Sequence, residues 1–260
     1  MKRYVPTIKV AFDKCSGEIL KAEGVFQKKK PAFEVRREFS EGKIDLYCCE
    51  CHQKLWIATS KKDQLYFRHG PNAGKCIMVD EIQSEEEIDI VCNIHIAKES
   101  PRHKELKNLI AESLRRTEGV DPYSIQCDDK CIVRDEGIRR PDVYCKFLGK
   151  EVVFEIQLSN LSLRYILSRY KFYKRYGIYL IWVLEEFELD RQGQLQRDIK
   201  YLAKHQNFFK LADSEGGLRL RCDFKKQFLR DGEEEIRDVW NHSIVSLAQL
   251  NFSESDMQVF

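Results

Sequence analysis

The clearest pattern along the chain is an alternation of apolar and polar residues on both sides of Gly149-Lys150. Because successive side chains of a strand point to opposite faces, this alternation predicts a β-hairpin over residues 142–158, with Gly149-Lys150 as its two-residue turn. One face of the hairpin is wholly apolar and is expected to be buried. That face carries Val143, Cys145, Phe147, Val152, Phe154, Ile156 and Leu158.

The opposite face of the hairpin is polar and carries two carboxylates. The predicted register sets Tyr144 opposite Glu155, and Asp142 opposite Gln157. Asp142 and Glu155 then lie diagonally across the face, about 7–8 Å apart at the backbone. Two carboxylates at that separation can converge on one divalent cation. The plainer interpretation is a solvated polar face, as in most half-exposed hairpins, and the hairpin taken alone favours it.

A helix is predicted before the hairpin. It starts at Ser100-Pro101, with proline at the first helical position, and keeps helical period to about Thr117. His103 and Lys107 are four residues apart and therefore share one face of this helix, and Glu99 lies just before it. The alternative interpretation is that all three are ordinary polar surface residues at the start of a helix, where glutamate is favourable in any case.

A second, strongly periodic helix is predicted over residues 161–176. It follows the capping pair Ser159-Asn160 and ends at Gly177. Its inner stripe is predicted to contain Leu163, Ile166, Leu167, Tyr170 and Tyr173. A different face carries Arg164, Ser168, Lys171 and Arg175, which suit phosphates, although most such stripes are merely solvated.

The remaining elements complete an α/β chain. Short strands at 124–127 and 131–134 and a fully buried strand at 178–184 give the order helix–strand–strand–strand–helix–strand over about 99–186. Residues 1–98 are predicted to be β-rich, with a loop at 28–31, a linking loop or short helix at 84–90, and strands at 7–12, 19–26, 33–39, 45–47, 54–58 and 65–67. The C-terminal part is predicted to hold a helix at 195–209, strands at 217–224 and 243–252, and a solvated turn at 233–235.

Composition restricts the class of protein. Of the 260 residues 33% are charged, yet the net charge is only +2, so a nucleic-acid surface would have to be a local patch. No stretch of about 18 consecutive apolar residues exists, which predicts no membrane span. The N-terminus lacks the apolar segment of a signal peptide. Ten cysteines without an export signal favour a cytoplasmic location and metal binding over disulfides.

The cysteines suggest a structural zinc site. Cys48-x2-Cys51 forms a knuckle between two predicted strands, and His69 and Cys76 would complete a Cys3His set. A closed site with four protein ligands is structural and not catalytic. Cys49 and His52 are competing ligands, and reduced cysteines without a metal are the alternative.

Several of these motifs, taken in order, resemble the CoiA-like family of competence proteins, a branch of the PD-(D/E)xK nuclease superfamily. The resemblance covers residues 45–186 and includes the cysteine knuckle with the Phe67-x-His69 that follows it. Its other motifs are Glu99-Ser100-x2-His103-x3-Lys107, Arg139-Arg140-Pro141-Asp142-Val143, Glu155-x-Gln157-x-Ser159, Arg169-x3-Tyr173 and the strand at 178–184.

The resemblance implies a fold and an activity. The fold would be a restriction-endonuclease-like αβββαβ core at 99–186, preceded by a β-rich zinc-binding domain at 1–98 and followed by a C-terminal extension at 187–260. The activity would be metal-dependent cleavage of DNA phosphodiesters with Mg²⁺ or Mn²⁺, acting on incoming or foreign DNA in phage defence or in DNA uptake and recombination.

The resemblance also implies roles for residues. Asp142 and Glu155 would bind magnesium, Glu99 would be a third acidic contributor, and Gln157 would stand where the superfamily usually has lysine. Gln157 is neutral and can only orient water or a ligand carbonyl through hydrogen bonds. Phosphate or developing charge would be held by His103 and Lys107, and DNA by Arg139, Arg140, Arg164, Lys171 and Arg175.

Two other functions stay open at this point. The first is a nucleic-acid-binding module without catalysis, which would bind DNA in the presence of a chelator and make no nicks. The second is a structural or regulatory subunit without nucleic-acid contact, in which the zinc region and the C-terminal strands bind a partner protein or a second copy of the chain. The modest net charge supports the second alternative.

Overall fold

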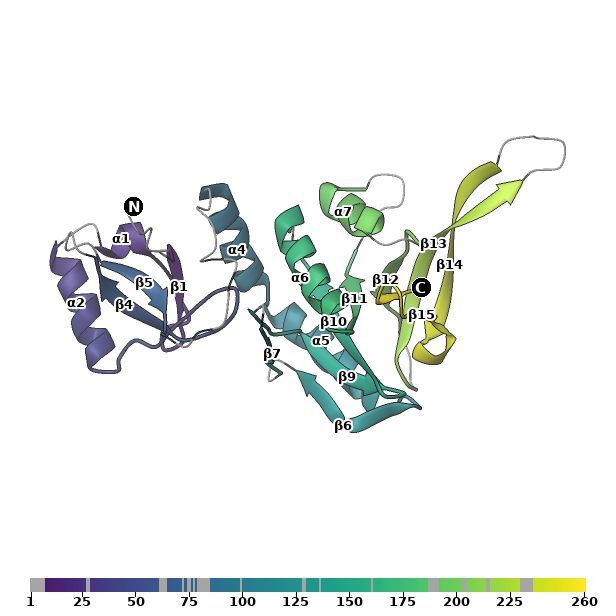
Figure 1. Cartoon of the computed structure of the whole chain (residues 1–260), viewed down its shortest axis with the longest axis horizontal. Helices are drawn as coiled ribbons and strands as arrows, with labels where there is room; N and C mark the ends of the chain where they lie inside the picture. The colour runs from purple at the N-terminus through teal and green to yellow at the C-terminus, as the bar shows by residue number, and fades with distance from the viewer. Residues whose placement is uncertain are drawn as a thin grey trace. The chain divides into compact units, whose positions relative to one another are not determined.

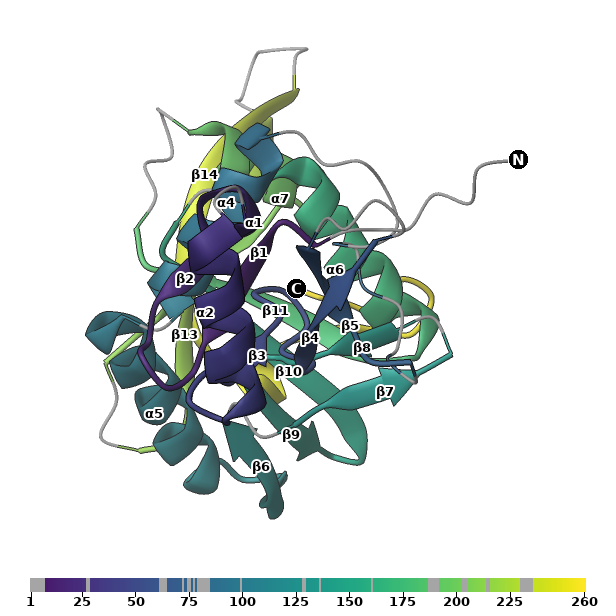
Figure 2. The same cartoon turned by 90° about the vertical axis from the view of Figure 1, so that its left-hand side faces the viewer.

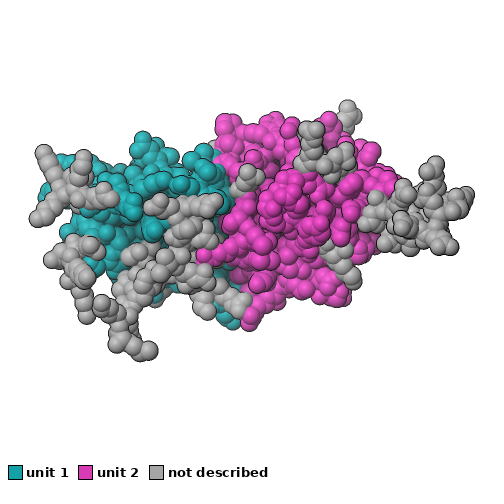
Figure 3. Space-filling view, turned by 90° about the horizontal axis from the view of Figure 1, so that it is seen from above, with its two compact units in different colours: residues 1–96, 132–140 teal, residues 97–131, 141–260 magenta. Residues whose placement is uncertain are grey.

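The fold is given by a computed structural model that divides into two compact units. It describes residues 8–26, 29–60, 65–71, 73, 76, 78, 85–98, 100–127, 130–135, 137–159, 161–186, 192–202, 205–213, 216–229 and 236–260. Unit 1 contains residues 1–96 and 132–140, and unit 2 contains residues 97–131 and 141–260 (Figure 3). The division differs from the predicted ranges at 132–140, a short hairpin that belongs to unit 1.

Unit 1 combines short strands with helices (Figure 2). A three-stranded sheet has the order β2-β1-β3, and two separate hairpins are formed by β4 with β5 and by β7 with β8. The strands are β1 (Val10–Asp13), β2 (Ile19–Lys21), β3 (Leu46–Tyr47), β4 (Leu55–Thr59), β5 (Leu65–His69), β7 (Ile132–Arg134) and β8 (Gly137–Arg139). The helices are α1 (Ala22–Phe26), α2 (Lys29–Ser40) and α4 (Glu85–Lys98), the last of which runs two residues into unit 2.

The prediction of a β-rich N-terminal part is wrong for residues 22–26 and 29–40. The predicted end of the strand at 19–26 is helix α1, and helix α2 takes the place of the described part of the predicted loop, residues 29–31, and of the predicted strand at 33–39. Glutamate and arginine, which favour helices, fill the positions between the apolar residues of 33–39, and a proline is tolerated in the first helical turn. The apparent alternation breaks at Phe33, which is 65% exposed, while Phe39 packs edge-on against Trp56.

Unit 2 is a mixed α/β unit built on a seven-stranded sheet of order β14-β13-β12-β11-β10-β9-β6 (Figure 1). Strands β10, β11 and β12 run parallel, and the other neighbours pair antiparallel. The sheet strands are β6 (Val120–Cys127), β9 (Val143–Phe147), β10 (Lys150–Gln157), β11 (Tyr179–Leu184), β12 (Phe208–Leu211), β13 (Arg219–Leu229) and β14 (Ile236–Ser246). The other elements are α5 (Pro101–Arg115), α6 (Leu163–Arg175), α7 (Gln194–Leu202), η1 (Leu247–Gln249), β15 (Phe252–Ser253) and β16 (Gln258–Val259).

The core of unit 2 covers one face of this sheet. Helix α5 supplies Leu106, Ile110 and Leu114 to it, and the apolar face of the predicted hairpin is buried there as expected. Phe154 has no exposed surface, and burying a side chain of this size stabilises the fold by about 2 kcal/mol. The opposite face of β10 is therefore left for the polar residues of the hairpin.

The hairpin turn is Leu148-Gly149 and not the predicted Gly149-Lys150. Both residues have positive φ, +47° and +79°, as a type I′ turn requires at its two central positions. The register consequently moves by two, and Tyr144 pairs with Val153. A shift of two keeps every side chain on its predicted face. Continued by one pair, the same register sets Asp142 directly opposite Glu155 instead of diagonal to it.

The C-terminal part extends the sheet. Strands β12, β13 and β14 continue it beyond β11, with β13 and β14 each 11 residues long. The predicted helix at 195–209 ends at Leu202, and the predicted strand at 243–252 is interrupted by η1. The predicted turn at 233–235 lies outside the described residues. Among the described helices, none has both the length and the apolar character needed to cross a bilayer.

Candidate functional site

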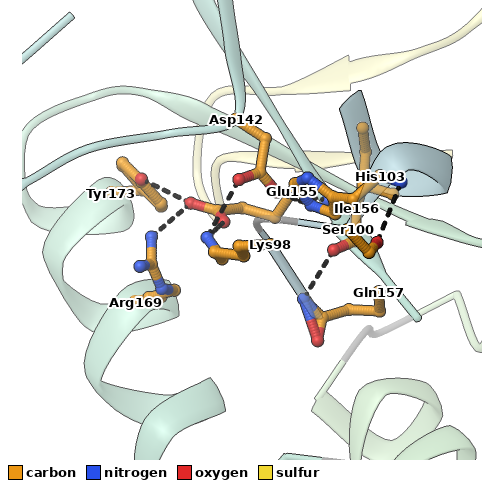
Figure 4. A network of polar contacts seen from close by, with 9 residues as sticks. All are labelled: Lys98, Ser100, His103, Asp142, Glu155, Ile156, Gln157, Arg169 and Tyr173. Atoms are coloured by element: carbon orange, nitrogen blue, oxygen red, sulfur yellow. Dashed lines mark hydrogen bonds and ion pairs between the residues drawn. The ribbon is translucent and has the colours of Figure 1, made fainter. Parts of the chain in front are cut away.

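Two carboxylates of the hairpin converge on a single lysine (Figure 4). Lys98 Nζ lies 2.9 Å from Asp142 Oδ1 and 3.4 Å from Glu155 Oε2. Asp142 is 2% exposed and Glu155 is fully buried, whereas the Lys98 side chain keeps 13% of its surface exposed. The interpretation of this polar face as a solvated surface is therefore wrong at its Asp142–Gln157 end.

The second oxygen of Asp142 is held by β10 and α5. Asp142 Oδ2 accepts a hydrogen bond of 2.8 Å from the backbone N–H of Ile156 and lies 3.3 Å from His103 Nε2. Helix α5 positions this imidazole, since the Ser100 side chain caps the helix by accepting a bond from the His103 N–H and Pro101 is its first residue. The predicted start of this helix is confirmed.

The second oxygen of Glu155 is held by α6. Glu155 Oε1 accepts hydrogen bonds from the Arg169 guanidinium and from the Tyr173 hydroxyl, the latter at 2.8 Å. Arg169 and Tyr173 are four residues apart and therefore share one face of the helix. A buried carboxylate needs such donors, because an unpaired charge in the interior is strongly disfavoured.

The inner stripe of α6 differs from the prediction. Leu163 is 49% exposed, and the helix turns a partly polar stripe toward the sheet. Its N-cap is Ser162 and not the predicted Ser159-Asn160 pair. The residues it buries are Tyr165, Ile166, Arg169, Phe172 and Tyr173.

Gln157 lies beside the two carboxylates on the same face of β10. Its side chain is buried, and its Nε2 donates a hydrogen bond of 2.9 Å to the backbone carbonyl of Ile156. Its Oε1 has no hydrogen-bond partner among the residues that the structure describes. A buried amide oxygen without a donor is uncommon in folded proteins, so this atom marks a place where a further donor or a cation would be accommodated.

Electrostatics fix the charge states of the central pair. Burial acts to raise the pKa of Asp142, but Lys98, His103 and the Ile156 N–H outweigh burial and hold this pKa well below its usual range. Burial likewise acts to lower the pKa of Lys98, but Asp142 above all, with Tyr165 and Glu155, raises it. At neutral pH the two groups are therefore an ammonium and a carboxylate.

Other predicted site residues lie elsewhere. Glu99 falls outside the described residues. Lys107 is buried one turn beyond His103 on α5 and is not a member of the network in Figure 4. Arg139 is buried in β8 of unit 1 and donates to the carbonyl of Ile138, so little of it remains for a phosphate.

The predicted DNA-binding residues are divided between the two units. Arg139 and the half-buried Arg140 belong to unit 1. The half-buried Arg164 and the exposed Lys171 and Arg175 belong to α6 in unit 2 and follow one face of that helix. These three stay predicted phosphate contacts.

Sequence reasoning missed Lys98, and it gave no role in the site to Arg169 and Tyr173, which it noted only as a motif of the resemblance. Lys98 ends α4, whose apolar residues give no signal for a lysine that turns inward. The spacing Tyr165-x3-Arg169-x3-Tyr173 was the available signal on α6, because it places an arginine between two tyrosines on one helical face.

In unit 1 the structure brings the four predicted zinc ligands together. The ligand atoms of Cys48, Cys51, His69 and Cys76 all lie within 4.8 Å of one another. The Cys48 and Cys76 sulfurs are 3.8 Å apart. A tetrahedron with Zn–S bonds of about 2.3 Å has edges of about 3.8 Å, so this separation suits zinc. The cluster could hold a structural metal ion such as zinc.

The crowded sulfurs of this cluster shift the pKa values of one another in opposite directions. Cys48 and Cys76 donate hydrogen bonds to the Cys51 sulfur and lower the pKa of Cys51, while the same crowding raises the pKa of Cys48. Cys51 Sγ also lies 3.2 Å from His69 Nε2 and from Gln53 Nε2. The competing ligands Cys49 and His52 are not members of the four-residue group found among the described residues. Burial raises the pKa of the Cys49 thiol.

Comparisons with known proteins give family matches. A search of curated proteins finds no match for this chain. A family model with the description Domain of unknown function (DUF7830) matches residues 17–83, which include all four zinc-ligand candidates. A second model, Domain of unknown function (DUF6035), matches residues 86–260, which is most of the chain and includes the whole network around Lys98. The chain therefore belongs to the DUF6035 family.

Proposed function

We propose that this protein is a metal-dependent nuclease that hydrolyses DNA phosphodiesters. The observation that carries the proposal is the convergence of Asp142 and Glu155 on one cation, the Lys98 ammonium, with distances of 2.9 and 3.4 Å. Because both carboxylates already contact the Lys98 ammonium, they are close enough together to bind one divalent cation in its place. The proposal rests on these residues, since the family description names no activity.

The donor set fits a small divalent cation. Asp142 Oδ1 and Glu155 Oε2 face the common point, while their partner oxygens are tied to the Ile156 N–H and to Tyr173. Carboxylate and amide oxygens are the ligands that Mg²⁺ and Mn²⁺ prefer. Asp142 and Glu155 would hold the ion, and the unpaired Gln157 Oε1 lies on the same face. Such an ion, when bound, polarises the scissile phosphate and lowers the pKa of a bound water.

Lys98 supplies the positive charge that Gln157 lacks. Its ammonium sits on a flexible four-carbon stem, and 13% of the side-chain surface is exposed, so the group can leave the carboxylates and approach a phosphate oxygen. Gln157 anchors the Ile156 carbonyl through its Nε2 and can accept a hydrogen bond from the attacking water at its Oε1. His103 is buried against Asp142 and serves to orient that carboxylate, which is a positioning role.

The order of elements also supports the proposal. The site residues come from α5, β10 and α6, with Asp142 just before β9 and Lys98 at the end of α4. Once the β7–β8 hairpin, which belongs to unit 1, is set aside, the elements of unit 2 follow the order α5-β6-β9-β10-α6-β11, as expected of the αβββαβ core of PD-(D/E)xK nucleases. The resemblance to the CoiA-like family rests on the same residues. We infer from it that the substrate is incoming or foreign DNA, in phage defence or in DNA uptake and recombination.

One observation favours a second candidate function. Asp142 and Glu155 are already neutralised by Lys98 and Arg169, so the network is complete without a metal. A catalytically inactive module for nucleic-acid or partner binding would need no more than this.

A cleavage assay separates the two candidates. Linear, circular and single-stranded DNA are incubated with the protein in Mg²⁺, Mn²⁺ or EDTA, and the products are resolved on denaturing gels. We expect cleavage with either metal and none in EDTA, and we expect Asp142→Asn and Glu155→Gln to abolish it. Glu151→Gln is the matched control. Glu151 is also a glutamate of β10 that accepts a hydrogen bond from a tyrosine hydroxyl, that of Tyr144, but it is not part of the network.

The circular dichroism spectrum and thermal midpoint of each variant check that the fold persists. Cleavage that survives both Asp142→Asn and Glu155→Gln would refute the assignment of the site. Binding of DNA without any cleavage in either metal would favour the inactive module.

A further inference from the structure

The sheet of unit 2 carries a basic surface at its C-terminal end. We call it the basic platform; it consists of Lys210 on β12, Arg219, Arg221 and Lys225 on β13, and Trp240 and His242 on β14. Arg219 and His242 are exposed, and the other four are partly exposed. Strand β14 forms one edge of the sheet and extends to one side in Figure 1.

The pairing of the strands places these side chains on one face. Lys210 pairs with Arg221, and Lys225 pairs with Trp240. Arg219, Arg221 and Lys225 are separated by even numbers of residues on one strand and therefore point the same way. The apolar core lies on the opposite face, where Leu220, Cys222 and Phe224 alternate with them.

The platform lies on the same face of the sheet as the carboxylate site. Glu155 pairs with Trp182 across β10 and β11, so these two side chains share a face. Val183 pairs with the core residue Phe209, which leaves Trp182 and Phe208 on the face of Glu155. Phe208 pairs in turn with Asp223 of β13. With strands about 4.8 Å apart, β14 lies about 20 Å from β10 across this face.

The charges of the platform are unbalanced. Lys210 and Arg221 are directly opposite each other, an arrangement that is destabilising for like charges on neighbouring strands. The acidic residue of this face on β13 is Asp223, which is buried and bound by Arg221 at 2.9 and 3.0 Å. Strand β14 contributes one acidic residue to the register of this face, Asp238, which pairs with Gln227; residues 239–246 contain none. Four cations against two aspartates, in a chain of net charge +2, give this face a local excess of positive charge that suits an anion.

Aromatic rings accompany the cations. Trp240 stacks on Phe208 with ring centroids 5.7 Å apart and an interplanar angle of 23°, and Lys225 Nζ lies 5.8 Å from the centre of the Trp240 ring. Phe208 is buried, so it supports Trp240 from beneath and leaves the indole partly open to solvent.

We propose that the basic platform binds single-stranded nucleic acid, with phosphates on Lys210, Arg219, Arg221 and Lys225 and a base stacked on Trp240. Cationic grooves with aromatic side chains are the usual means of binding unpaired strands, since each base offers a ring face for stacking. A duplex keeps its bases stacked inside the helix and could use the cations alone. As a statement about the substrate, this inference rests on the proposed nuclease function, and it makes an unpaired strand the preferred substrate.

The test measures binding of fluorescein-labelled 20-nucleotide DNA and RNA, and of the matching DNA duplex, by fluorescence anisotropy in EDTA. The triple variant Lys210→Gln/Arg219→Gln/Lys225→Gln is expected to bind the single strands at least tenfold more weakly than the native chain. Its plot of log affinity against log salt should be shallower by about 2, because each lost phosphate contact removes about 0.7. Arg221 is left intact because Asp223 depends on it.

The control removes the same charge from the other face of the sheet. Lys104→Gln/Arg115→Gln/Arg116→Gln changes exposed cations at and just after α5, which packs on the core face, and should leave binding within twofold. Trp240→Phe keeps a ring on Phe208 and should reduce the quenching of tryptophan fluorescence by the bound strand.

Equal losses in the two triple variants, native affinity in the platform variant, or tighter binding of the duplex than of the single strands would each overturn the proposal. Comparison of the DNA and RNA strands identifies which of them the platform prefers. Because the measurement is made in EDTA, its outcome is independent of cleavage, so failure of the platform and failure of the nuclease assignment are separate results.

Discussion

Lys98 joins two carboxylates that lie 44 and 57 residues further along the chain. Buried ion pairs add little net stability compared with apolar residues, because desolvation offsets the attraction. Removal of one partner is different, since it leaves the other charge buried and uncompensated. Lys98 is therefore the residue whose substitution reports most directly on the charge of the site.

We predict that Lys98→Met destabilises the protein by about 3 kcal/mol, because Asp142 and Glu155 lose their common cation. If these carboxylates bind a divalent ion, millimolar Mn²⁺ should return part of that stability to the variant and stabilise the native chain less. Urea denaturation with and without Mn²⁺ measures both effects. Lys200→Met is the matched control, because Lys200 is also buried but donates to the neutral Gln192; it should show no response to the metal. A Lys98→Met variant that Mn²⁺ does not stabilise would argue against the metal site.

The lowered pKa of Asp142 predicts a loss of stability in acid. The folded-state pKa lies below the usual value of about 3.9, so between the two values the unfolded chain binds more protons than the folded one. The contribution of Asp142 is therefore present above about pH 4 and is lost as the pH falls below it. Urea midpoints from pH 7 to pH 3 should fall more steeply for the native chain than for Asp142→Asn. Parallel curves would show that Asp142 does not carry this dependence.

At this scale the sequence predicted the carboxylates and His103, but not the cations that hold the carboxylates. Asp142, Glu155 and Gln157 follow from the alternation of the hairpin, which is a local property. Lys98 and Arg169 are brought to them by tertiary contacts, and a single sequence gives no pattern for an ion pair between residues so far apart.

Among the elements, the β9–β10 hairpin depends on a turn with an unfavourable residue. Leu148 adopts φ +47°, a left-handed conformation that costs a residue with a side chain roughly 1 kcal/mol. We predict that Leu148→Asn raises the thermal midpoint by about 2–4 °C, since asparagine followed by glycine suits a type I′ turn and Leu148 is 69% exposed. Leu148→Val should lower it, because β-branched residues avoid positive φ. Differential scanning calorimetry measures both shifts, and shifts of equal sign would contradict the turn assignment.

The elements also show where local patterns mislead. The faces of the hairpin were predicted because strands alternate with a period of two, yet its register was not, because Gly149 suits either position of a two-residue turn. Residues 33–39 alternate like a strand but form a helix within a short, highly charged segment. The inner stripe of α6 was predicted from hydrophobicity alone. In the structure the helix turns Arg169 and Tyr173 toward the sheet, because the buried carboxylate of Glu155 needs their hydrogen bonds.

The whole molecule has two separate cores, one in each unit, and the cysteine cluster contributes to the core of unit 1. We predict a single zinc ion per chain by elemental analysis. Removal of it by a chelator should lower the unfolding transition of unit 1 and leave that of unit 2 unchanged, because metal binding stabilises only the folded form that has the site. Calorimetry of the native chain with and without chelator measures this.

Two variants connect the zinc to its ligands. Cys76→Ser should lose the zinc, and Cys49→Ser should keep it, although Cys49 is adjacent to Cys48 and is also buried in the core. Zinc retained by Cys76→Ser or lost from Cys49→Ser would mean that a different set of residues holds the ion.

The insertion of residues 132–140 into unit 1 has a practical consequence for dissecting this protein. The polypeptide passes from one unit to the other after residues 96, 131 and 140, so the two units are interleaved along the chain. A fragment that ends at residue 98 lacks β7 and β8, and a fragment that begins at residue 99 carries them as an orphan hairpin just ahead of Asp142. To express unit 2 alone, residues 132–140 have to be excised and the flanking ends rejoined by a short linker, and unit 1 needs the excised hairpin grafted back onto it.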